Sequence, residues 1–503
     1  YTGLAPYLRE KIRRDASEII AAYNTTHGTA YNLYKDRLIL TTTLNADMQR
    51  YAEAAVKEHM KKLQHEFYSH WENREPWYNK PQVLEQAIQN SPVYLSLKGQ
   101  GYNEKQIAEI MNRKKAMMVY SAYQGEASAE MSSIDSIKHY LKILHPGMIA
   151  VEPNSGKIRV WIGDLDYKYF QYDQVGAPRQ VGSVFKPVVY SAAIHNGAQL
   201  DAYYKNEQKT YKEYEDWTPR NSDNDYTGYY TLKGALSKSI NTIAVEVLLQ
   251  TGIEKTIVHA RNLGIKSELP QYPSLALGSA DIPLSEMILP YMCFANAGKL
   301  MTPYYLLEIR DQSGTVLYQA PVPESKEVLP SQEAYVMSNI LSAVINEGTG
   351  RRLRTTYGLK NELAGKTGTT QNQADGWFIG YNSRIVVGIR VGANDRNIHF
   401  NSIRLGQGAH MALPIFGLFM RECLKDPAYA RWESLSFPLV PVAEQKELDT
   451  PIFQEKMNLF ERIGNKKLKK RALVHPTDTV VKKEKKGFFR KIGNLFRKKK
   501  EEE

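Results

Sequence analysis

The stretch Gly182-Ser183-Val184-Phe185-Lys186-Pro187 holds the one S-x-x-K pattern of this 503-residue chain, and it indicates an activated serine. A serine hydroxyl is a poor nucleophile without a nearby base. Residues at i and i+3 lie on one face of a helix, so the Lys186 amine can reach the Ser183 hydroxyl if burial or nearby positive charge keeps that amine neutral. Pro187 suits a first helical turn, which places Ser183 at a helix start, where free backbone N–H groups can bind an oxyanion.

Alone, this pattern is weak evidence, because two of its four positions are free and a serine that caps a surface helix gives the same string. A second signal is the run 366–370, Lys-Thr-Gly-Thr-Thr, which directly precedes two predicted strands at 376–381 and 385–391. We expect this run to lie on an edge strand. A lysine, hydroxyls and a glycine along such an edge can hold a carboxylate, and the edge can pair with an extended peptide. An ordinary loop is the alternative.

The third element of the site requires a choice between two Ser-x-Asn strings. Ser222-Asp223-Asn224 lies in a polar stretch that is typical of a loop. Ser239-Ile240-Asn241 lies between two apolar runs of a predicted helical region at 231–250. Polar side chains in such a buried setting need a specific reason, so we favour Ser239 and Asn241.

The surrounding sequence predicts an α+β domain with an antiparallel sheet. Two strands, 148–151 and 158–162, are joined by a Pro-Asn-Ser-Gly turn and form a hairpin. A second hairpin, 376–391, lies near the other end of the unit, with helices predicted between them. Strands at both ends and helices between them favour this fold class. The predicted helices are 184–197, 231–250, 254–263, 285–297 and 411–422, and further upstream we expect a helical lead-in over 1–35, a β-rich run at 38–43 and a helix over 46–63.

Taken in order, S-x-x-K, S-x-N and K-T-G resemble the serine penicillin-recognising enzymes, a group that comprises the penicillin-binding proteins and the serine β-lactamases. The flanks are similar to class A penicillin-binding proteins, with Val181 where proline is usual. The matching stretches are 179–187, 217–221, 235–241, 276–278, 294–298, 365–370 and 375–381, together with a linker-like segment at 40–53.

The resemblance implies the penicillin-binding-protein transpeptidase fold, an antiparallel five-stranded sheet flanked by helices with a smaller N-terminal linker subdomain. It implies a D,D-transpeptidase that forms an acyl-enzyme on D-Ala-D-Ala stem peptides and passes the acyl group to an acceptor amine. By carry-over, the catalytic residues are Ser183, Lys186, Ser239 and Lys366, and the substrate-binding residues are Asn241, Thr367, Gly368 and Thr369. No metal or other cofactor is implied.

Further expectations follow from the same resemblance. The partners are stem peptides, β-lactam antibiotics, the inner membrane and wall-synthesis proteins, and the location is the extracytoplasmic face of the cytoplasmic membrane. Class A members carry a membrane anchor and a glycosyltransferase domain before the linker, and we expect this chain to be a fragment without them. A D,D-carboxypeptidase or β-lactamase-type hydrolase, and an inactive penicillin-binding scaffold, are the alternatives.

We expect four regions along the chain. Residues 1–60 form the linker, 61–146 an insertion of unknown role, 147–438 the transpeptidase domain and 439–503 a polar to strongly basic tail. Of the net charge of +12, nearly all lies in residues 462–503, which hold 16 Lys or Arg and 5 Asp or Glu. The body is almost neutral, which argues against a nucleic-acid partner. An apolar stripe in the tail, 488–496, predicts either a membrane-surface helix or a solvated basic tail.

Overall fold

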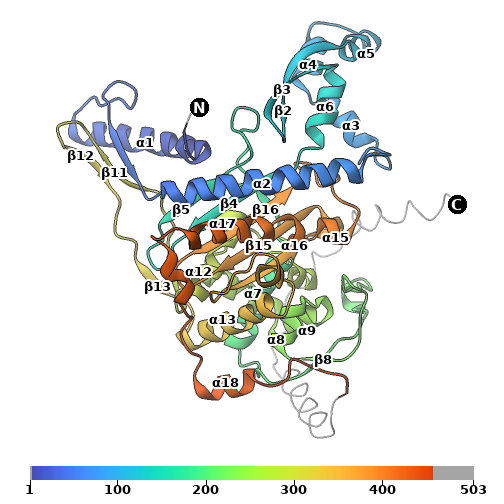
Figure 1. Ribbon diagram of the computed structural model, residues 1–503, viewed down its shortest axis with the longest axis vertical. Helices are drawn as coiled ribbons and strands as arrows, with labels where there is room; N and C mark the ends of the chain where they lie inside the picture. The colour runs from blue at the N-terminus through green and yellow to red at the C-terminus, as the bar shows by residue number, and fades with distance from the viewer. Residues whose placement is uncertain (1–2, 457–503) are drawn as a thin grey trace, which may run out of the picture. The chain divides into compact units, whose positions relative to one another are not determined.

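A five-stranded antiparallel sheet forms the centre of the molecule in the computed structural model, which describes residues 3–456 (Figure 1). The strand order is β14-β15-β16-β4-β5. The sheet joins distant parts of the chain, since Ile149 of β4 lies opposite Gly388 of β16. The predicted α+β class and antiparallel sheet are confirmed. The strands are β4 His145–Val151, β5 Ile158–Ile162, β14 Ala364–Thr369, β15 Asp375–Tyr381 and β16 Val386–Gly392.

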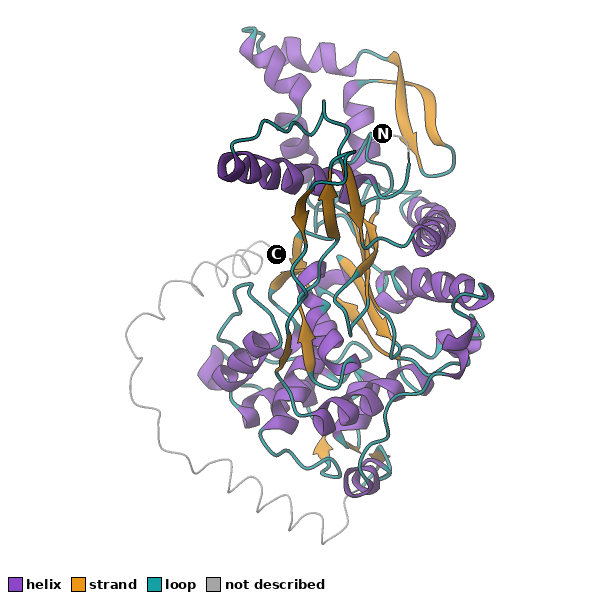
Figure 2. Cartoon of the chain, turned by 90° about the vertical axis from the view of Figure 1, so that its left-hand side faces the viewer, coloured by secondary structure: helices purple, strands orange, loops and turns teal. Residues whose placement is uncertain are grey.

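Helices cover both faces of this sheet, so its strands are buried on both sides (Figure 2). Side chains of β4 alternate between two apolar cores, as the two-residue period of a strand requires. Ile149 and Val151 pack in the core that includes helices α7 and α13, and Met148 and Ala150 pack in the core that includes α2 and α17. These helices are α2 Ala46–His70, α7 Lys186–His195, α13 Ser331–Asn346 and α17 Leu413–Lys425.

Smaller sheets, a helical group and further helices, among them α10 Ile253–Asn262, α14 Arg352–Thr355 and α15 Ile403–Gly406, surround these layers. The group between α2 and β4 contains α3 Gln82–Gln89, α4 Pro92–Gly99, α5 Glu104–Asn112, β2 Lys115–Ser121, β3 Gly125–Met131 and α6 Ser133–Leu141. Elsewhere lie α1 Pro6–His27, β1 Ile39–Thr42, β6 Pro178–Gln180, β7 Tyr204–Lys205, β8 Tyr229–Tyr230, β9 Asp281–Pro283, β10 Lys299–Met301, β11 Leu306–Arg310, β12 Val316–Gln319, β13 Ser325–Glu327, α18 Val442–Leu448 and β17 Phe453–Gln454. No helix of residues 3–456 is both long and apolar enough to cross a membrane.

Several helices differ from the sequence prediction. The predicted helix 231–250 is two helices, α8 Leu232–Lys238 and α9 Asn241–Thr251, and 285–297 is also divided, into α11 Leu284–Met287 and α12 Leu289–Ala295. The helix expected at 411–422 is preceded by a short turn, α16 Gly408–Met411. Helix α2 continues past its predicted end at 63 and through the expected boundary at 60, because its apolar face keeps packing in the core as far as Phe67. The four predicted regions and the three boundaries between them stay predictions, and the stripe at 488–496 lies outside the described residues.

Candidate active site

Ser183 lies in a 3-10 turn, Gly182–Phe185, that leads directly into α7. The neighbouring side chains of Val184 and Phe185 are fully buried, whereas Ser183 is partly exposed. The buried Tyr291 hydroxyl donates a hydrogen bond of 2.8 Å to the Val184 carbonyl. This hydrogen bond helps to hold the turn in place, and Ser183 stays partly exposed within it.

Lys186 is the first residue of α7, and its side chain is completely buried. Its Nζ donates to the Ser239 carbonyl and to Asn241 Oδ1, each at 2.6 Å, and lies 3.3 Å from Ser239 Oγ. Burial, and secondly the positive charge of Lys366, lower the pKa of Lys186 well below its ordinary value. This amine therefore loses its proton far more readily than a lysine in water.

The break between α8 and α9 aims Ser239 at Lys186. Ser239 adopts a left-handed backbone conformation, with φ 61°, which costs a non-glycine residue roughly 1 kcal/mol or more. This conformation ends α8 and turns the Ser239 carbonyl and hydroxyl toward the lysine. Asn241, the first residue of α9, then adds its side-chain oxygen to the same amine.

Lys366 also contacts Ser239. Its buried Nζ donates to Ser239 Oγ at 2.8 Å and to the Thr367 carbonyl at 3.0 Å. Burial lowers the pKa of Lys366 to about 7. A hydroxyl oxygen can accept two hydrogen bonds. Because Lys186 and Lys366 both donate to Ser239 Oγ, the hydrogen of the Ser239 hydroxyl is directed away from both lysines.

Strand β14 carries Lys366 to Thr369 along the edge of the sheet, as expected, and within residues 3–456 it pairs with β15 alone. The Ser183 turn packs closely against the end of this strand. Gly182 has φ 58°, and a Cβ at this position would lie 2.6 Å from the Thr369 carbonyl oxygen. Only glycine permits this approach, which packs the residue before Ser183 against the backbone of Thr369.

The two hydroxyls of β14 already have protein partners. Thr369 Oγ1 accepts the backbone N–H of Gly408 at 3.1 Å, and Thr367 Oγ1 lies 2.6 Å from Thr349 Oγ1. Thr349 also donates its backbone N–H to the Ser237 carbonyl at 3.2 Å, so it links β14 to the helix before Ser239. Sequence reasoning missed Thr349, because a threonine between two glycines gives no chemical signal of its own.

Asn221 is a second residue beside the site that sequence reasoning did not single out. Its buried Oδ1 accepts the backbone N–H groups of Asn241 at 2.9 Å and Thr242 at 3.2 Å, and thereby caps the start of α9. Its Nδ2 donates to Asn206 Oδ1 at 2.8 Å. The exposed run 222–224 follows directly, in a loop as predicted.

The structure thus gathers Ser239, Asn241 and Lys366 around Lys186, which lies one turn after Ser183. Residues 367–369 continue strand β14 from Lys366. Two lysines of lowered pKa share one hydroxyl, an arrangement suited to moving protons to and from a serine nucleophile. Within the described residues, no three His, Cys, Asp or Glu side chains come together as a metal site requires.

Comparison with known protein families agrees with this arrangement. The family model of the penicillin binding protein transpeptidase domain matches residues 147–397, and that of the penicillin-binding protein middle domain matches residues 71–144. The chain belongs to the penicillin-binding proteins. Penicillin-binding protein 1A of Aquifex aeolicus is 31% identical over an alignment of 411 residues, and the match covers 77% of this chain and 54% of that protein. Penicillin-binding protein 1A of Pseudomonas aeruginosa is 33% identical over an alignment of 333 residues, and the match covers 56% of this chain and 40% of that protein.

This penicillin-binding protein chain therefore spans about half, or less, of the length of these curated relatives. Among solved structures, penicillin-binding protein 1A of Haemophilus influenzae has a TM-score of 0.64 at 20% identity, covering 87% of this chain and 72% of that chain. PonA1 of Mycobacterium tuberculosis, in complex with penicillin V, has a TM-score of 0.54 at 17% identity, covering 82% and 92%. These two likenesses extend the agreement to the fold.

Proposed function

We propose that this chain is a peptidoglycan D,D-transpeptidase that forms an acyl-enzyme on Ser183. The observation that carries the proposal is the shared Ser239 hydroxyl, held by two buried lysines of lowered pKa directly beside the Ser183 turn. Membership of the penicillin-binding proteins supports the substrate class, a stem peptide that ends in D-Ala-D-Ala. The proposed place of action is the cell envelope, outside the cytoplasm.

In the first step, Ser183 Oγ attacks the carbonyl carbon of the penultimate D-Ala. A neutral Lys186 amine has two N–H groups, and the two short hydrogen bonds to Ser239 O and Asn241 Oδ1 use both of them, so only the protonated amine also donates to Ser239 Oγ, at 3.3 Å. The lone pair of the neutral amine is then free to take the Ser183 proton. The C–N bond of the substrate breaks, and the leaving D-Ala amine receives a proton through Ser239.

In the second step, an amine from another stem peptide attacks the acyl carbon and the C–O bond to Ser183 breaks. The attacking nitrogen loses a proton, and one returns to Ser183 Oγ, so the enzyme regains its starting state. In its protonated form, Lys366 donates to Ser239 Oγ, which stabilises this oxygen as it gives up its proton, and supplies positive charge near the terminal carboxylate. The lowered pKa of both amines keeps these transfers feasible near neutral pH.

Substrate binding falls to the edge of β14 and to Asn241. Thr367, Gly368 and Thr369 hold the terminal carboxylate and pair with the extended peptide. Asn241 Nδ2 donates one hydrogen to the Arg220 carbonyl at 2.8 Å, which leaves its second hydrogen for the substrate amide. The backbone N–H groups of Ser183 and Thr369 stabilise the oxyanion.

A penicillin tests the acyl-serine step directly, because a β-lactam mimics D-Ala-D-Ala and its acyl-enzyme is long-lived. Intact mass after incubation should show one penicillin adduct on the wild-type chain and none on Ser183→Ala. No adduct on the wild type would refute the acyl-serine proposal and favour an inactive scaffold. A stem-peptide substrate with and without an added amine acceptor then separates transpeptidation from hydrolysis, since a hydrolase gives only the carboxylic acid product.

A further inference from the structure

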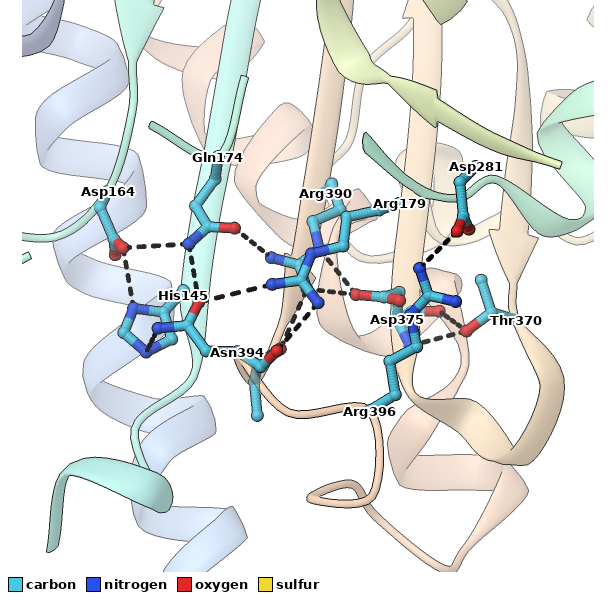
Figure 3. Close-up of polar contacts among 11 residues, drawn as sticks. His145, Asp164, Gln174, Arg179, Asp281, Thr370, Asp375, Arg390, Asn394 and Arg396 are labelled. Carbon is cyan, nitrogen blue, oxygen red and sulfur yellow. Dashed lines mark hydrogen bonds and ion pairs between the residues drawn. The ribbon is translucent and has the colours of Figure 1, made fainter. Parts of the chain in front are cut away.

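A buried polar network that the proposed reaction does not use lies at the ends of strands β4, β15 and β16 (Figure 3). At its centre, the fully buried Arg390 donates through Nε to Asp375 Oδ1 at 2.7 Å and through a terminal nitrogen to Gln174 Oε1 at 2.7 Å. Gln174 in turn donates to Asn394 Oδ1 at 3.0 Å and reaches Asp164, which pairs with His145 at 2.8 Å.

Buried charges are costly to desolvate, and an apolar cluster of the same volume is often at least as stable. Core packing alone therefore does not explain two buried arginines, Arg179 and Arg390, in one place. Burial, and next the charge of Arg390, lower the pKa of Arg179, while the charge of Asp375 opposes this, so the three groups act on one another. What the network provides is fixed geometry between the segments that carry its members.

One of these segments is the end of β14. Asp375 donates its backbone N–H to Thr370 Oγ1 at 2.8 Å, and its carbonyl accepts the Thr370 N–H at 3.1 Å. These two bonds close the turn that directly follows Thr369. The side chain of Asp375 is held by Arg390, so the network determines where β14 ends.

The other segment is β6, which leads to the serine turn. Arg179 lies on β6, four residues before Ser183, and donates to the Asn394 carbonyl at 3.0 Å. The next residue, Gln180, accepts the backbone N–H of Gln371 at 3.3 Å and so joins β6 to the turn after β14. The network therefore reaches both backbone segments that supply the proposed oxyanion donors.

We propose that Asp375 is a positioning residue that, together with Thr370, Arg390 and Arg179, sets the separation of the Ser183 and Thr369 backbone N–H groups. The inference rests on the proposed acyl-serine function. These donors act on the charge that develops during acylation, and a shift of about 1 Å in such a group can cost roughly 100-fold in rate. Disturbing the network should slow acylation while leaving the initial binding of the ligand unchanged.

A matched pair of variants at Thr370 tests this with little disturbance of volume. Thr370→Val is isosteric and removes the hydroxyl that accepts the Asp375 N–H, whereas Thr370→Ser keeps it. Stopped-flow acylation by a fluorescent penicillin over a range of concentrations separates the dissociation constant of the first complex from the acylation rate constant. We expect Thr370→Val to lower the rate constant roughly 10- to 100-fold with an unchanged dissociation constant. Thr370→Ser should stay close to wild type.

Two further variants locate the effect. Asp375→Asn should slow acylation in the same sense, and if it does not fold, the Thr370 pair still decides. Arg396→Gln breaks an exposed ion pair with Asp281 beside the network and should acylate normally. Thermal denaturation shows whether the Thr370→Val protein is folded. A folded Thr370→Val protein that acylates at the wild-type rate, or in which only the dissociation constant changes, would overturn the positioning role. A wild-type chain that forms no adduct would instead refute the proposed function, and this inference with it.

Discussion

Replacing Lys366 by Met tests whether the buried amine of the proposed site lowers the folding stability of the protein. Lys366 is fully buried, and burial lowers the pKa of its amine from an ordinary 10.5 to about 7. The unfolded chain keeps the ordinary value, so between about pH 7 and 10.5 the unfolded state binds more protons than the native state. Stability therefore rises with pH across this window, and the full penalty is present below about pH 7.

The size of the penalty follows from the difference in pKa. Each pKa unit is worth about 1.4 kcal/mol, so the buried amine costs on the order of 5 kcal/mol at pH 6 and on the order of 2 kcal/mol at pH 9. Met is similar in length and uncharged, but it loses the hydrogen bonds to Ser239 and Thr367, worth roughly 1 kcal/mol each. We expect the free energy of unfolding of Lys366→Met to exceed that of wild type by on the order of 3 kcal/mol at pH 6, and to equal it at pH 9.

Urea denaturation followed by circular dichroism at both pH values measures this difference. Lys360→Met is the matched control, because Lys360 is exposed and should show no such dependence on pH. The same variants, incubated with a penicillin, should show loss of acylation for Lys366→Met alone. A Lys366→Met protein whose stability relative to wild type is the same at pH 6 and pH 9 would refute the reasoning.

Two other predictions concern groups that support the site. Asn221→Ala leaves the buried N–H groups of Asn241 and Thr242 without their acceptor, so thermal and urea denaturation should show a loss of roughly 1–3 kcal/mol, and acylation by penicillin should slow; a variant with unchanged stability would contradict this. Burial, with a smaller effect of His195, lowers the pKa of His259 from 6.5 to about 4. As the pH drops from 6.5 to 4, the unfolded chain takes up a proton on this histidine that the native state does not. The free energy of unfolding of the wild type should therefore fall by about 3 kcal/mol over this range. His259→Gln should remove that contribution, and an unchanged slope of unfolding free energy against pH between 4 and 7 would show that His259 is not its source.

The elements that sequence predicted well are those in which local pattern and tertiary environment agree. Strands 148–151, 376–381 and 385–391 are apolar runs bounded by turn residues, and they became buried strands. The helix predicted over 231–250 was wrong at one point, where Ser239 adopts a left-handed conformation. Local propensity does not anticipate this break, because the carbonyl that it redirects bonds to Lys186, more than fifty residues away in the chain.

The sequence by itself determined the chemical groups, their order along the chain and the fold class. S-x-x-K, S-x-N and K-T-G are local strings, and the alternation of apolar and turn residues is a local pattern, so both can be read without coordinates. Only the tertiary structure decided how acidic the two lysines are, which residues hold Asn241 and Thr369 in place, and that one buried network connects β6 to the end of β14. The pKa of an amine depends on the water excluded around it, and an asparagine in a polar stretch caps a helix only once the chain has folded back on itself.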